Sequence, residues 1–164
     1  MFLFHPHLRE RSYPDARSEE VMHKTIEFFE TKGLSRVKED DHNAVWYQDF
    51  VDFVGKERIF ATMCTPSGYG AADARWDTWR VCEFAEILGF YGLPYWYVYQ
   101  VTVLGLGPIW MSDSSELKQR AAGLLEANEV AHWLLLKAQV DVNELTGEAD
   151  PVVRLIDFEH PERN

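Results

Sequence analysis

Two pairs of residues in this 164-residue sequence have types and spacings that could support chemistry. Glu83 and Glu86 are three residues apart, which would suit an acid and a base on one helix face, but glutamates at this spacing usually form a solvated face. His5 and His7 form a His-x-His pair that could bind a metal. No third ligand accompanies them, and Pro6 favours a terminal turn. We therefore expect no catalytic or metal-binding role for either pair.

Two further motifs invite a functional interpretation. Gly105 and Gly107 resemble part of a dinucleotide-binding loop, but a third glycine is missing and Pro108 follows, so the motif predicts a helix break. Cys64 and Cys82 stand far apart and lack a Cys-x-x-Cys partner, which argues against a zinc or redox site. We expect both cysteines to be free, partly buried thiols.

The composition limits the class of protein and its partners. Hydrophobic residues make up 46% of the chain, enough for one domain with a real core. The formal net charge of −11 would repel phosphate backbones and anionic membranes, so nucleic acid is not an expected partner. Residues 1–4 are apolar but have neither a cationic leader nor a long apolar run. The expected location is therefore the cytoplasm.

The apolar spacing predicts an all-α fold, a bundle of about six helices. The predicted helices cover about residues 18–32, 43–54, 73–88 and 95–106, a segment that opens at Asp113, and residues 130–145. Residues 65–70 are rich in proline and glycine and predict a loop. Residues 152–158 predict a short strand or an extended arm.

The segment 95–106 is apolar on almost every side, with Gln100 and Thr102 as its polar side chains. A helix that is apolar all round is expected to be buried all round, which predicts a place at the centre of the bundle. The segment is shorter than the roughly 20 apolar residues that a bilayer requires, so no membrane span is expected.

Residues 1–130 resemble the N-terminal helical domain of FAD-dependent acyl-CoA dehydrogenases, over about four-fifths of the chain. The opening Met-Phe-Leu-Phe-His-Pro-His is similar to the start of one group in that family. The most specific stretches, in order, are Arg75-Trp76-Asp77-Thr78, Glu86-Ile87-Leu88-Gly89-Phe90-Tyr91-Gly92-Leu93, Tyr95-Trp96-Tyr97 and Gln100-Val101-Thr102-Val103-Leu104-Gly105-Leu106-Gly107-Pro108-Ile109-Trp110.

The resemblance implies a role for the central apolar helix. In that family the N-terminal helices close one side of the acyl pocket, a β-barrel holds the flavin, and a C-terminal helical domain supplies most of the remainder. The resemblance thus implies an acyl-CoA ligand. Tyr97, Gln100, Val101 and Leu104 share one face at i, i+3, i+4 and i+7 and are the candidate substrate-binding residues. The alternative is that they are ordinary bundle core.

The resemblance stops after residue 130. Residues 131–164 are expected to add a helix and a tail to the same domain, either as an unrelated extension or as a terminal helix of the parent enzyme. The flavin barrel is missing and no catalytic base can be identified. FAD, the cofactor of the family, is therefore not expected to be bound by this chain alone, and the chain alone is expected to be inactive.

Three hypotheses for the function follow. The first is a truncated or split acyl-CoA dehydrogenase that needs a flavin-domain partner chain and has an exposed apolar helix face, which favours a homodimer. The second is a non-catalytic helical binding or regulatory module, with the helix at 130–145 as a lid, that binds acyl-CoA or a protein partner. The third is a relic without a selected role.

Overall fold

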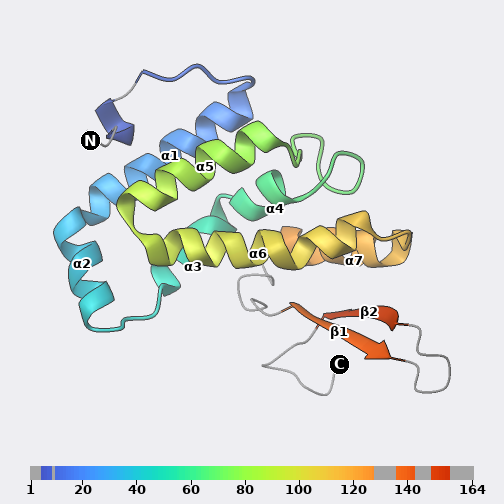
Figure 1. Cartoon of the computed structure of the whole chain (residues 1–164). Helices are drawn as coiled ribbons and strands as arrows, with labels where there is room; N and C mark the ends of the chain where they lie inside the picture. The colour runs from blue at the N-terminus through green and yellow to red at the C-terminus, as the bar shows by residue number, and fades with distance from the viewer. Residues whose placement is uncertain (1–4, 9, 128–135, 143–148, 156–164) are drawn as a thin grey trace.

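The computed structural model describes residues 5–8, 10–127, 136–142 and 149–155. Seven α-helices account for most of these residues, which confirms the all-α bundle (Figure 1). A 3-10 turn and two strands complete the described elements. In chain order they are η1 (Pro6–Leu8), α1 (Ala16–Lys32), α2 (Leu34–His42), α3 (Gln48–Lys56), α4 (Ile59–Cys64), α5 (Thr78–Tyr91), α6 (Leu93–Met111), α7 (Ser115–Glu126), β1 (Leu136–Val142) and β2 (Ala149–Leu155).

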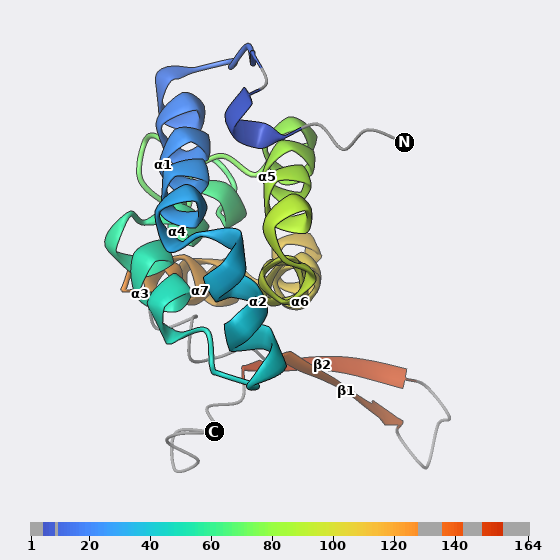
Figure 2. The same ribbon diagram turned by 90° about the vertical axis from the view of Figure 1, so that its left-hand side faces the viewer.

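The helices pack so that α6 lies at one side of the bundle. α1 and α5 run side by side, and α6 continues from α5 after a turn at Gly92 (Figures 1 and 2). α7 returns behind α6 and packs against both α6 and α4. Viewed end-on in Figure 2, α6 lies below α5, with α2 and α7 to its left and the two strands beneath it, and no helix is drawn to its right. Among the described residues, this position leaves one face of a very apolar helix without a helical neighbour, although β1 also contacts α6.

Side-chain caps fix where three of the helices begin. The carboxylate of Asp15 accepts a hydrogen bond from the backbone N–H of Ser18 at 2.8 Å, and Asp77 accepts from the N–H of Arg80 at 2.9 Å. The cap of α7 is Ser114, one residue later than the Asp113 expected from the sequence. Each cap satisfies an N–H group that the helix itself leaves unpaired.

Aromatic rings connect α1, α3, α5 and α6 in the core. Phe29 of α1 stacks on Tyr91 of α5 with ring centroids 4.7 Å apart. Tyr95 of α6 meets Phe29 and Phe50 edge-to-face at 5.0 and 5.1 Å. Pairs of this geometry add about 0.5–1.5 kcal/mol each beyond the area they bury. They hold the first half of α6 against the bundle.

The buried Arg80, 2% exposed, joins four segments at the opposite end of α5 from Gly92. Its guanidinium donates to Ser18 Oγ at 2.9 Å, to Asp15 Oδ1 at 3.2 Å and to the carbonyl of Thr62 at 3.0 Å. It also donates to the carbonyls of Asp73 and Arg75 at 3.0 and 3.2 Å. We call Arg80 and these acceptors the Arg80 network; it ties the α1 cap, α4 and the loop before α5 together.

The C-terminal part corrects one prediction. A helix over residues 130–145 is wrong for residues 136–142, which form β1 and pair antiparallel with β2 in the register Leu136↔Leu155 to Val142↔Ala149. The remaining residues of that predicted helix lie outside the described part of the chain. The expected strand at 152–158 is confirmed for residues 152–155, which belong to β2.

Four features of the helical part also differ from expectation. The predicted helix over residues 43–54 begins only at Gln48, and residues 34–42 form the unexpected helix α2. The short helix α4 was not predicted either. The break expected at Gly105 to Pro108 is wrong, because α6 continues to Met111 with Leu106 and Ile109 buried beneath it. Burial of these two side chains outweighs the poor helix propensity of glycine and proline.

The helices within the described ranges include none whose length and hydropathy would suffice to cross a bilayer.

Candidate functional site: an apolar groove on α6

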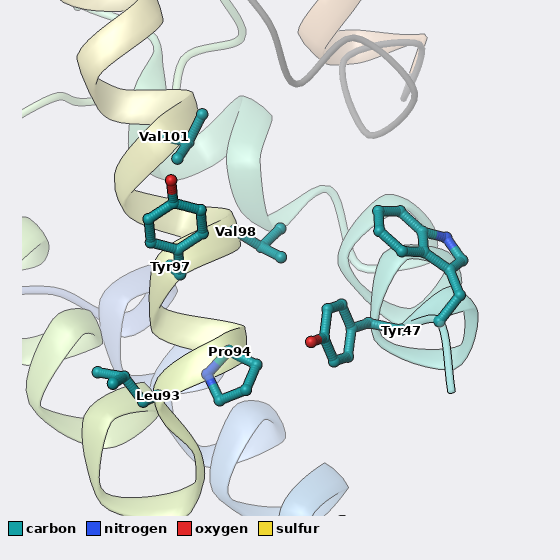
Figure 3. A pocket seen from close by; sticks show the side chains of 7 residues that line it. Tyr47, Leu93, Pro94, Tyr97, Val98 and Val101 are labelled. Atoms are coloured by element: carbon teal, nitrogen blue, oxygen red, sulfur yellow. The ribbon is translucent and has the colours of Figure 1, made fainter. Parts of the chain in front are cut away.

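An open groove runs between α6 and the segment that leads into α3. Its volume is about 650 Å³, within the range of roughly 300–1,000 Å³ that is typical of small-molecule pockets. Figure 3 shows Tyr47 across the groove from the α6 side chains. We call it the α6 groove, and its lining residues are Trp46, Tyr47, Leu93, Pro94, Tyr97, Val98 and Val101.

The wall opposite α6 is held by the turn between α2 and α3. The N–H of Val45 donates to the carbonyl of Asp40 at 2.9 Å, and the N–H of Ala44 donates to the carbonyl of Asp41 at 3.1 Å. Ala44 has a φ of 52°, in the left-handed region that a residue with a Cβ adopts only at a cost in energy. The turn therefore presents Trp46, 58% exposed, at the groove rather than burying it in a helix.

The second wall residue, Tyr47, connects the groove to the core. Its ring lies 5.2 Å from the ring of Tyr95, which packs against α1 and α3 on its other side. Trp46 stands beside Tyr47 with ring centroids 5.5 Å apart. Within this wall, Tyr47 is thus packed against the bundle core, whereas Trp46 is exposed to solvent.

The structure separates the four substrate-binding candidates predicted from the sequence. Tyr97 and Val101 line the α6 groove. Gln100 is half-buried and Leu104 is 63% exposed, and neither is among the lining residues. Tyr97 is itself 62% exposed. The alternative that these residues are ordinary bundle core therefore fails for Tyr97 and Leu104.

The expectation that α6 is buried on every side is wrong. Its inner face is buried, with Tyr95, Tyr99, Leu106 and Ile109 in the core. Its outer face is apolar and open to solvent: Leu93 is 67% and Met111 is 87% exposed. The residues of this outer face are Leu93, Tyr97, Val101, Leu104, Pro108 and Met111, of which Val101 is half-buried. Large apolar side chains gathered on one surface are typical of an interaction site.

Five of the groove residues were not predicted from the sequence: Trp46, Tyr47, Leu93, Pro94 and Val98. Trp46 and Tyr47 were placed inside the predicted helix over residues 43–54, although the polar run Asp-Asp-His-Asn before them is typical of a helix end. An adjacent aromatic pair shortly after such a run was the available signal. Leu93 and Pro94 carry no such signal, because they are exposed through the position of α6 in the bundle.

A polar hollow borders the groove at Trp46, but its charges are already paired. Lys32 Nζ lies 2.9 Å from Asp40 and 2.5 Å from Asp49, and Arg36 Nε lies 2.8 Å from Asp40. Burial opposes protonation of Lys32, but the hydrogen bonds to both aspartates outweigh it and raise its pKa above the usual range. Since two cations face two carboxylates, the hollow has no surplus positive charge for an anionic group.

The groove contains no obvious catalytic group. No carboxylate, histidine or cysteine is among its lining residues in the described part of the chain. Cys64 is buried, and burial raises the pKa of its thiol, which keeps it protonated and unreactive. Cys82 is exposed, and both cysteines are free, as expected. What the groove can do is bind an apolar body; it cannot by itself transfer a proton from a carboxylate or imidazole.

The other two candidate motifs have structural partners. Glu83 forms an ion pair with Arg11, whose side chain is almost fully buried, and Glu86 lies 3.6 Å from the same guanidinium. The prediction of a solvated glutamate face is therefore wrong for Glu83, whose side chain is only 14% exposed. His5 Nε2 lies 3.7 Å from Glu30. No group of three potential metal ligands occurs among the described residues.

Comparisons of the chain with protein-family models, with curated proteins and with solved structures find no match. The likeness to acyl-CoA dehydrogenases thus stays an expectation from the motifs quoted above, and the α6 groove is the feature from which a function is argued.

Proposed function

We propose that this chain is the acyl-binding helical part of a split acyl-CoA dehydrogenase, and that its α6 groove holds the fatty acyl chain. The observation that carries the proposal is the apolar groove itself, whose lining includes Tyr97 and Val101, two of the four residues that the resemblance suggests for substrate binding. The volume of about 650 Å³ suits an extended alkyl chain, and apolar walls bind such a chain by removing it from water.

The charges around the groove support a tail-binding site rather than a head-group site. The lining has no ionised side chain, and the adjoining hollow pairs Lys32 and Arg36 with Asp40 and Asp49. The phosphates of coenzyme A would lose hydration there without gaining a free cation. In the proposed complex the acyl chain therefore enters the groove and the coenzyme A portion stays outside it.

Catalysis in this proposal depends on a second chain. Acyl-CoA dehydrogenation needs a base for the α-proton and a flavin that accepts hydride, and the lining residues of the groove supply neither. A flavin-domain partner would bring FAD and the base. A cytoplasmic location belongs to the same proposal, and the two unbridged thiols of Cys64 and Cys82 fit a reducing compartment.

The second candidate is a non-catalytic helical module that binds acyl-CoA or a protein. The observation in its favour is that a groove of drug-sized volume is present without any acid, base or thiol among its lining residues. The two candidates differ in one measurable property. A split enzyme reduces an artificial electron acceptor when acyl-CoA, FAD and the flavin-domain chain are all added, whereas a binding module does not. Both predict no reduction by this chain with acyl-CoA and FAD alone.

Thermal unfolding with decanoyl-CoA tests the proposed site. At about 100 times the dissociation constant the ligand should raise the melting temperature by on the order of 5–10 °C, because it binds only the folded chain. Coenzyme A without an acyl chain should give no shift. Val101→Trp fills the groove and should abolish the effect of decanoyl-CoA.

Leu34→Trp is the matched control, since Leu34 is a partly exposed apolar residue of α2 that does not line the groove. This variant should respond to decanoyl-CoA like the unmodified chain. Equal shifts with coenzyme A and decanoyl-CoA, or an unchanged shift in Val101→Trp, would overturn the proposal.

A further inference from the structure

The outer face of α6 has two properties that bear on what covers it. The whole helix, from Leu93 to Met111, lacks Asp, Glu, Lys and Arg. In a chain with a formal net charge of −11, this is a surface that another copy can approach without placing like charges in contact. A strongly charged partner would find no complementary group on it.

The apolar positions on this face are arranged almost symmetrically about Thr102, a buried residue on the opposite side of the helix. Leu93 and Met111 each lie nine residues from it, which is about 13 Å along the axis. Tyr97 and Pro108 lie five and six residues away. The same holds nearer the centre, where Val101 and Leu104 lie one and two residues away. Such spacing is self-complementary under a two-fold rotation, in which one surface meets its own copy in reverse.

We propose that two copies of this chain pair antiparallel through the outer faces of their α6 helices. The two-fold axis passes near Thr102. Leu93 of one copy then faces Met111 of the second copy, Tyr97 faces Pro108, and Val101 faces Leu104. Packed helices have axes about 8–10 Å apart, close enough for these side chains to interdigitate. Met111 of the second copy comes to lie beside Leu93, a lining residue of the α6 groove, so that pairing narrows the open side of the groove.

The exposed apolar area is sufficient for a weak dimer. Tyr97 is 62% exposed, which leaves on the order of 100–150 Å² of an aromatic side chain in water. With Leu93, Leu104, Pro108 and Met111 the outer face offers roughly 600 Å² per copy, at the lower end of the about 1,200–2,000 Å² in total that specific interfaces bury. We therefore expect association in the micromolar range, so that dimers appear as the concentration rises.

Sedimentation or light scattering over about 1–200 µM tests the pairing. The full chain should change from its monomer mass of 19.1 kDa to twice that mass. Leu104→Glu places two carboxylates beside the proposed axis and should remain monomeric with an unchanged melting temperature. Leu8→Glu makes the same change at another highly exposed leucine, on η1, and should dimerise normally. A monomer at every concentration would mean that another partner covers this face and would overturn the proposal, as would dimerisation of Leu104→Glu.

Cross-linking tests the antiparallel direction. In a Cys82→Ser background, Leu93→Cys and Met111→Cys proteins are prepared separately and treated with a short bismaleimide. The mixture of the two should cross-link efficiently, whereas either protein alone should not, because like ends lie on the order of 25 Å apart in the antiparallel dimer. Cross-linking of Leu93→Cys to itself at the efficiency of the mixture would contradict the arrangement. Leu93, Tyr97 and Val101 belong both to the proposed interface and to the lining of the α6 groove. A chain that stays monomeric at every concentration and still binds decanoyl-CoA refutes this inference alone.

Discussion

The Arg80 network and the outer face of α6 are opposites within one small bundle. Arg80 is a buried cation whose donors all point at acceptors of the same chain. The outer face of α6 has large exposed apolar side chains, and no helix in the described part of the chain covers them. The donors of Arg80 are paired within the chain, whereas the apolar side chains on the outer face of α6 stay exposed to water. This difference indicates that stability resides at the Arg80 end and that binding resides on α6.

The largest expected effect comes from breaking the Arg80 network. Arg80→Leu takes the guanidinium away from the carbonyls of Thr62 and Asp73 and from the carboxylate of Asp15, which keeps its hydrogen bonds from Ser18 and Arg75. Removing one side of a buried ionic network typically costs about 3–5 kcal/mol. The melting temperature should fall by roughly 6–20 °C. Arg36→Leu is the matched control, because Arg36 is an exposed arginine, and its effect should stay within about 1 kcal/mol. Equal losses in both variants would contradict the assignment of stability to this end.

Truncating a side chain to alanine should cost much more free energy of unfolding on the inner face of α6 than on its outer face. Ile109→Ala creates a cavity at a fully buried position and should cost about 2–5 kcal/mol in urea unfolding. Met111→Ala lies two residues further along the same helix, is 87% exposed and should change the free energy of unfolding by less than about 0.5 kcal/mol. Because Met111 belongs to the proposed dimer interface, both variants are to be compared below the association range. A large loss in Met111→Ala there would mean that its side chain is covered within one chain.

Acid should weaken the Arg80 end at a defined pH. Burial opposes ionisation of Asp15, but hydrogen bonds from Ser18 and the charges of Arg80 and Arg75 outweigh it and lower its pKa to about 2. A lowered pKa means that this stabilisation is complete above the ordinary value of 3.8 and is lost as the pH falls from about 4 to about 2.

Asp15→Asn keeps a helix cap but removes the charge, and should cost about 1–2 kcal/mol at pH 7, allowing for partial exposure of the side chain. The difference in urea midpoint between the two proteins should shrink towards pH 2. A difference that is constant from pH 7 to pH 2 would mean that the charge of Asp15 does not matter.

A substitution at Trp46 should have the smallest effect on the stability of the fold and still weaken binding of decanoyl-CoA. Trp46→Ala removes an exposed wall of the α6 groove and should alter the free energy of unfolding by less than about 1 kcal/mol. Loss of one aromatic contact should weaken decanoyl-CoA binding by about tenfold, measured by calorimetry. Undiminished affinity would place the acyl chain elsewhere.

The sequence predicted helices well where one apolar stripe faces the core. For α1 the prediction of residues 18–32 lies within Ala16–Lys32, and Gly33, with a φ of 78°, ends the helix. α2 was missed because Val37 is the only buried apolar side chain of Leu34–His42. The sequence of this segment therefore lacks the repeated apolar spacing from which a helix is predicted. Residues 136–142 alternate apolar and polar types with a period of two, Leu-Lys-Ala-Gln-Val-Asp-Val, which is the pattern of a strand.

The groove could be predicted only in part, because its position depends on how distant segments of the chain pack together. The spacing of Tyr97 and Val101 placed them on one face of a helix, but which face of α6 is covered depends on where α1, α5 and α7 pack, and α6 is apolar on both sides. The far wall of the groove comes from residues 46–47, about 50 positions away in the sequence. No periodicity within one helix can reveal such a contact.

The most direct test of the central claim follows valine methyl groups by NMR during titration with decanoyl-CoA. Val98 and Val101 line the α6 groove, whereas Val21 and Val54 are buried in the core and do not line it. The proposed site predicts saturable shifts for Val98 and Val101, with Val21 and Val54 nearly unchanged. Shifts spread evenly over all four valines, or no shift at Val98 and Val101, would contradict it.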